Sequence, residues 1–142
     1  MIYVSLDPGK TTGVCIWEDS HFVTNQITAK AAGFGEWLDQ LQRMDVLIYE
    51  SFQYRRLPNV ELTAVELIGV VKYWAYSKDV HVMAQPPSSK TLWDDKKLRR
   101  VELYKPNAPH ANDAARHMLY YISNLPPNNF LRKEILNKVK VT

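Results

Sequence analysis

The chain has 142 residues, of which 46% are hydrophobic and 23% charged, with a formal net charge of +3 at pH 7. This composition excludes a disordered chain or a fibrous repeat, and we expect one domain over residues 1–142. No apolar run approaches the roughly 20 residues that cross a bilayer, and Met1 leads into IYVSL without a signal pattern. With Cys15 as the only cysteine, we expect a cytoplasmic protein without membrane contact.

The first part of the chain predicts three antiparallel strands. The apolar run IYVSL at residues 2–6 forms a buried strand that Pro8 and Gly9 end at Asp7. Two extended stretches follow at residues 13–17 and 21–27, and the short polar turn between them makes a hairpin.

A helix, a fourth strand and a second helix come next. Apolar side chains in residues 31–43 recur at spacings of three and four, which predicts a helix covering one face of the sheet. The apolar run DVLIYE at residues 45–50 predicts a strand that ends on Glu50. Residues 59–77 are again helical, and Gly69 indicates a close approach to a neighbouring element.

The remaining segments complete an α/β fold. The run VHVMA at residues 80–84 predicts the last strand, residues 88–99 a short basic helix, and residues 110–125 a longer helix. Residues 130–139 fit either a further helix or a loose tail. The element order predicts a mixed five-stranded sheet, three antiparallel strands first and then two parallel ones, with helices on both faces. The first and fourth strands, being apolar throughout, are expected at the centre.

The stretch SLDPGKTTG at residues 5–13 contains GKTT, which resembles the end of a phosphate-binding loop. Such a loop requires G-x-x-x-x-G-K-[ST] and opens a helix. Here the first glycine position holds Val4, and a predicted strand follows. The sequence therefore argues against a phosphate loop and draws attention to Asp7.

Acidic residues stand at three places that folding can bring together. Asp7 and Glu50 end the two central strands, and Asp113 lies one turn into the late helix, three residues after His110 and on the same face. Oxygen and nitrogen ligands on such rigid supports suit Mg²⁺ or Mn²⁺. Each residue also has a structural interpretation, as a turn former, an exposed strand end or a helix-terminal residue.

The ordered set of motifs resembles the RuvC-type Holliday junction resolvases, in the form of their small phage-like members, within the RNase H-like or retroviral integrase superfold. The run YVSLDPGKTTGVCIW is similar to that family's first strand and hairpin, and VLIYESF to its second acidic strand. The run HANDAARHMLYY resembles its closing helix. The likeness covers about residues 2–124, so it implies an RNase H-like three-layer fold.

The resemblance implies a metal-dependent endonuclease that cuts branched DNA, such as four-way junctions, and leaves 5′-phosphate and 3′-hydroxyl ends. Asp7, Glu50, His110 and Asp113 would be catalytic residues and ligands of two Mg²⁺ ions, for which Mn²⁺ substitutes. Lys90 would be a further catalytic residue that contacts phosphate.

The resemblance also implies a homodimer and a DNA-binding surface. The helix over residues 59–77 is a candidate dimer surface, because Tyr73 and Trp74 widen its apolar face. Basic and aromatic side chains are expected to contact DNA, against the alternative of a solvated basic face. The candidate nucleic-acid-binding residues are Lys10, Phe52, Tyr54, Arg55, Arg56, Lys90, Lys96, Lys97, Arg99 and Arg100.

Two alternative functions stay open, and a third is disfavoured by the sequence. A protein with this fold could bind junctions with weak or no cleavage, or process RNA instead of DNA. A sugar-kinase or actin-like ATPase also opens with Asp-x-Gly, but it needs a second glycine-rich loop and a second lobe, and this chain has five glycines in all. We read His117, Tyr120 and Tyr121 as packing residues.

Overall fold

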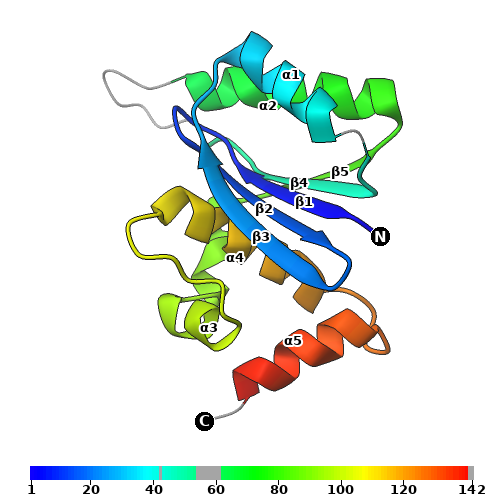
Figure 1. The fold of residues 1–142 in the computed structure, drawn as a ribbon, viewed down its shortest axis with the longest axis vertical. Coiled ribbons are helices and arrows are strands. Elements are labelled where there is room, and N and C mark those ends of the chain that lie inside the picture. The colour runs from blue at the N-terminus through cyan, green and yellow to red at the C-terminus, as the bar shows by residue number, and fades with distance from the viewer. Residues whose placement is uncertain (42, 54–61, 141–142) are drawn as a thin grey trace.

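A computed structural model describes residues 1–41, 43–53 and 62–140. Its centre is a mixed five-stranded sheet in the order β3-β2-β1-β4-β5 (Figure 1). Strands β1, β2 and β3 pair antiparallel, whereas β4 pairs parallel with both β1 and β5. The strands are β1 (Tyr3–Asp7), β2 (Thr12–Glu18), β3 (His21–Ile27), β4 (Val46–Glu50) and β5 (His81–Gln85). The predicted sheet is confirmed, with β1 in the middle.

Helices cover both faces of the sheet. On one side lie α1 and α2, and on the other α3, α4 and α5 (Figure 1). Each face has its own apolar core, one around Phe34, Leu38 and Leu67, the other around Met118, Leu119 and Ile122. The helices are α1 (Ala31–Leu41), α2 (Thr63–Lys78), the 3₁₀ helix η1 (Pro87–Leu92), α3 (Asp95–Arg100), α4 (Pro109–Ser123) and α5 (Phe130–Lys140). This covering explains why β1 is buried along its whole length.

Two helical segments differ from the prediction. The helix expected over residues 88–99 is divided into η1 and α3, with Trp93 buried between them. The Asp94 side chain accepts a hydrogen bond from Lys97 N, and this cap starts α3 as a separate helix. The stretch at residues 130–139 is the helix α5 and not a loose tail. Residues 59–61 of the predicted second helix lie outside the described residues.

The close approach predicted at Gly69 is wrong, and Gly13 makes one instead. A Cβ atom added at Gly69 would meet nothing within 4 Å, whereas one added at Gly13 would lie 1.7 Å from the carbonyl oxygen of His110. Only glycine lets β2 pass this close to the start of α4. Over the described ranges, none of the helices is long and apolar enough to span a membrane.

Candidate active site

The strand period places the first two acids on one face of the sheet. Side chains alternate along a strand, and Tyr3 and Ser5 of β1 face the same side as α4, as do Val46 and Ile48 of β4. Asp7 and Glu50 continue these two series at the ends of the strands. Because β1 and β4 are parallel neighbours, both carboxyl groups lie at the same edge.

Three contacts hold the start of α4 over this edge. The backbone of His110 lies against Gly13, the register partner of Asp7. Ser5 Oγ donates a hydrogen bond of 2.8 Å to the carbonyl oxygen of Ala114. Gln26 Oε1 accepts from the backbone N–H groups of His110 and Ala111, at 2.9 and 3.2 Å, and so caps a helix whose N-cap residue has no capping side chain. Asp113 and His110 are thereby brought to the sheet edge.

The five predicted catalytic side chains lie close together at this edge. Lys90 Nζ is 2.9 Å from Glu50 Oε1 and 3.2 Å from Asp113 Oδ2. His110 Nδ1 is 3.3 Å from Asp7 Oδ2. The ammonium of Lys90 thus bridges two of the acids, and the imidazole of His110 contacts the third.

Burial and mutual repulsion perturb the acids. Burial, together with the hydrogen bond and charge of Glu50 and the charge of Asp113, raises the pKa of Asp7 from 3.8 to about 9. For Glu50, burial acts in the same direction but is outweighed by interactions with His117, Asp7 and Lys90, which hold the pKa well below its ordinary range. The two neighbouring carboxyl groups therefore share one proton, held on Asp7.

The pKa of Lys90 is shifted by burial and by the neighbouring carboxylates, which act in opposite directions. Burial alone would lower its pKa, but the carboxylates of Glu50 and Asp113 outweigh burial and raise the pKa above its ordinary value. Lys90 therefore stays protonated, and its positive charge partly compensates the acids.

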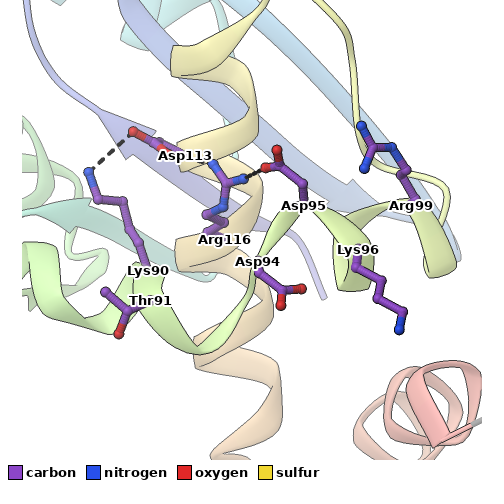
Figure 2. Close-up of a pocket in the computed structure, with 8 residues that line it drawn as sticks. All are labelled: Lys90, Thr91, Asp94, Asp95, Lys96, Arg99, Asp113 and Arg116. Atoms are coloured by element: carbon purple, nitrogen blue, oxygen red, sulfur yellow. Dashed lines mark hydrogen bonds and ion pairs between the residues drawn. The ribbon is translucent and has the colours of Figure 1, made fainter.

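The structure adds two residues that the sequence did not single out as functional. Arg116 donates to Asp113 Oδ1 at 2.7 Å and to the carbonyl oxygen of Trp93 at 2.7 Å, and it pairs with Asp95 (Figure 2). His117 is fully buried, and its Nδ1 lies 2.7 Å from Gln85 Oε1. The spacing of Arg116 and His117 from Asp113, three and four residues, was the available signal.

The donor set fits a hard divalent cation in its chemistry. Three carboxylates and one imidazole lie at one edge, and carboxylate oxygens and imidazole nitrogens are ligands that Mg²⁺ or Mn²⁺ accepts. However, within the described part of the chain, no group of three or more His, Cys, Asp or Glu side chains has the arrangement that would hold a metal ion. Lys90, placed between Glu50 and Asp113, separates two of these donors.

A hollow of about 630 Å³ opens beside the acids and has a mixed lining of basic and acidic side chains (Figure 2). Lys90, Lys96, Arg99 and Arg116 contribute its cations. Lys96 and Arg99 are exposed on α3, and the guanidinium of Arg99 lies 4.2 Å from the centre of the Tyr104 ring. This hollow extends the site along the surface of α3.

The other candidate nucleic-acid-binding residues have varied surroundings. Lys97 donates to the carbonyl oxygen of Leu92, and Arg100 to that of Val139, each at 2.8 Å, so both support local structure. Phe52 is half-buried against the core beneath α1 and α2. Lys10 is exposed in the turn after β1. The last three candidates, Tyr54, Arg55 and Arg56, lie outside the described residues.

Comparison with known proteins identifies the fold. No protein-family model matches the sequence, and no curated protein sequence matches it. Among solved structures, Thermus thermophilus RuvC in complex with a Holliday junction substrate has a TM-score of 0.61 at 16% identity, covering 84% of this chain and 91% of that chain.

Two further similar structures come from a virus and from yeast. The fowlpox virus Holliday junction resolvase has a TM-score of 0.53 at 16% identity and covers 85% of this chain and 97% of its own. The yeast mitochondrial Holliday junction resolvase Ydc2 has a TM-score of 0.54 at 13% identity and covers 97% of this chain and 80% of its own. The resemblance stated from the sequence is thus confirmed in three dimensions: this chain has the RNase H-like fold of the RuvC-type resolvases.

Proposed function

We propose that this protein is a metal-dependent endonuclease that cuts branched DNA such as four-way junctions, leaving 5′-phosphate and 3′-hydroxyl ends. One observation carries the proposal. Asp7, Glu50 and Asp113, far apart in the sequence, meet His110 and Lys90 at one edge of a resolvase-like sheet. Of the similar proteins, Thermus thermophilus RuvC was solved with a Holliday junction substrate. We expect the protein to act in the cytoplasm of a bacterial or phage-infected cell, as a single domain.

In this proposal, Asp7, Glu50, His110 and Asp113 hold two Mg²⁺ ions, and Mn²⁺ can replace them. When bound, such ions supply an activated water and stabilise the leaving 3′ oxygen. Asp7 would have to be ionised to act as a ligand, so its raised pKa opposes metal binding until it loses its proton. Lys90 would donate hydrogen bonds to the phosphate and stabilise its developing charge.

The DNA backbone would continue along the hollow beside the acids. Lys96 and Arg99 are exposed there and are placed to contact phosphates, so binding should weaken steeply with salt. Lys97 and Arg100 would contribute positive potential while holding backbone carbonyls. Lys10, Phe52, Tyr54, Arg55 and Arg56 stay candidates for DNA contacts.

The proposed homodimer would use the outer face of α2. Trp74, which the sequence suggested for this surface, is instead buried and donates its indole N–H to Asp39 at 2.8 Å. The exposed aromatic side chains of α2 are Tyr73 and Tyr76, at 75% and 86% relative exposure. These two tyrosines support the dimer proposal.

The test is cleavage of a labelled four-way DNA junction by the wild-type protein, Asp7→Asn and the exposed-acid control Glu36→Gln. Linear duplex DNA and a four-way RNA junction serve as parallel substrates, each in Mg²⁺, Mn²⁺ or EDTA. We expect wild type and Glu36→Gln to cut only the DNA junction and only with metal. Asp7→Asn should be at least about 100-fold slower, as expected when a group that organises transition-state stabilisation is lost. Undiminished cutting by Asp7→Asn would refute the assignment.

A second candidate function is junction binding without cleavage. The placement of Lys90 between Glu50 and Asp113 favours it, because this ammonium compensates the acids without a metal. Binding of the DNA junction in EDTA, with no cutting by wild type in either metal, would select this candidate. Cutting of the RNA junction instead would indicate RNA processing.

A further inference from the structure

Asp95 is an acidic residue inside the hollow through which the DNA backbone is proposed to run. It is the first residue of α3, and it lines the hollow together with the cations of Lys96, Arg99 and Arg116. Its side chain is 52% exposed, so a bound phosphate could come close to it. A carboxylate in this position repels phosphate, and the proposed function by itself does not account for it.

The neighbouring Asp94 differs from Asp95 in its contacts. The Asp94 side chain accepts a hydrogen bond of 2.9 Å from Lys97 N and so caps α3. The Asp95 carboxylate instead pairs with the guanidinium of Arg116, which lies between Asp95 and Asp113 (Figure 2). The position of Asp95 is thus best understood through its arginine partner.

Arg116 is held in place by two other hydrogen bonds. Its Nε donates to the carbonyl oxygen of Trp93 and its Nη1 to Asp113 Oδ1, each at 2.7 Å, whereas Nη2 pairs with Asp95. The Arg116 side chain is only 14% exposed, yet it reaches the wall of the hollow. If Asp95 turned away, Nη2 would be a fixed, charged donor facing the hollow, and a guanidinium is well suited to phosphate oxygens.

The two partners differ in how easily they can move. Arg116 is mostly buried and anchored twice, whereas the exposed carboxylate of Asp95 can turn into water without breaking either anchoring bond. Ion pairs with one exposed partner contribute little to stability. A phosphate offers Nη2 a charge-assisted hydrogen bond of the same kind, so it can replace the carboxylate.

We propose that Arg116 is a phosphate-binding residue and that Asp95 occupies its phosphate site in the DNA-free protein. DNA binding then exchanges the carboxylate of Asp95 for a backbone phosphate, and Asp95 lowers the affinity by the strength of the ion pair that must break. The inference rests on the proposed function, because it takes the hollow as the path of the DNA backbone.

The test compares Asp95→Asn with Asp94→Asn by anisotropy titration of a fluorescein-labelled four-way DNA junction, in EDTA and at one low salt concentration. Both variants remove one negative charge from the same hollow, and asparagine at position 94 still caps α3. We expect Asp95→Asn to bind the junction about two- to fivefold more tightly than Asp94→Asn, the factor that corresponds to one exposed ion pair. A loosened structure would not raise the affinity.

A double-mutant cycle separates the exchange from simple repulsion between Asp95 and DNA. In the Arg116→Met background, the gain in affinity caused by Asp95→Asn should shrink by the same two- to fivefold factor, about the strength of the lost pair. The gain caused by Asp94→Asn should be equal in both backgrounds, because Asp94 does not pair with Arg116. Thermal unfolding checks that each variant is folded.

The outcomes that overturn the inference differ from those that overturn the proposed function. Asp95→Asn that binds no more tightly than Asp94→Asn would overturn the exchange, and so would an equal gain from Asp95→Asn in the Arg116 and Arg116→Met backgrounds. In both cases junction binding by wild type would leave the proposed function standing. Wild-type protein that does not bind the junction would overturn the proposed function, and the exchange with it.

Discussion

Replacing Asp7 by asparagine should stabilise the metal-free protein while it abolishes activity. The pKa of Asp7 is raised to about 9 from its ordinary 3.8, chiefly by burial and by Glu50. Because the folded pKa lies above the unfolded one, the stability linked to Asp7 is fully present below pH 3.8 and is lost as the pH rises towards 9. Asparagine has no proton to lose, and its amide can donate to Glu50 as the protonated acid does.

The size of the effect follows from the same shift. At pH 7, keeping Asp7 protonated costs about 4 kcal/mol relative to the unfolded chain, at roughly 1.4 kcal/mol for each pH unit above its ordinary pKa. The lowered pKa of Glu50 offsets part of this cost, since its ionised form is stabilised by the same interaction. We therefore expect Asp7→Asn to gain about 2 kcal/mol at pH 7, or roughly 5 °C in Tm.

The assay is thermal unfolding in EDTA from pH 4.5 to 9, with Glu36→Gln as the control for loss of an exposed acid. Wild type and Glu36→Gln should lose stability in parallel across this range, and Asp7→Asn should lose much less, so that the gap widens with pH. Curves for wild type and Asp7→Asn that stay parallel, or an Asp7→Asn protein less stable at pH 8, would refute the reasoning about the shared proton.

Three further substitutions test how the site is built. Gly13→Ala should lower the free energy of unfolding, measured by urea titration, by more than about 3 kcal/mol, because its Cβ would lie 1.7 Å from the His110 carbonyl oxygen. The matched control Gly69→Ala should be neutral or stabilising in the same titration, because a Cβ added at Gly69 meets nothing within 4 Å. Arg116→Met should cost about 2 to 4 kcal/mol in that titration through its lost charged hydrogen bonds. Lys90→Met should cut junctions at least about tenfold more slowly while still binding them, which single-turnover kinetics and gel shifts would measure; unchanged cutting would contradict its role.

Much of the fold could be predicted because hydrophobic pattern fixes which face of each strand is buried. The apolar runs ending in Asp7 and Glu50 place both acids at strand ends, and pairing the two strands as parallel neighbours puts them at one edge. The helical spacing of His110 and Asp113 then gives a shared face. These relations are local or follow from simple periodicity, so the sequence was sufficient for them.

Contacts between distant segments could not be predicted in this way. Gln26 caps α4 from a strand more than 80 positions away, and hydrophobic periodicity carries no information about such a partner. Arg116 and His117 were not predicted as site residues, because helical spacing indicates which side chains share a face but not which other elements that face contacts. The division of the helix at residues 88–99 did have a signal, the capping residue Asp94, which a continuous basic pattern obscured.

The most direct test of the central claim is anomalous diffraction from a crystal of the protein soaked in Mn²⁺. We expect two anomalous peaks bounded by Asp7, Glu50, His110 and Asp113, with the ammonium of Lys90 moved out of its place between Glu50 and Asp113. Absence of peaks at saturating Mn²⁺, with Lys90 still bridging the two acids, would contradict it.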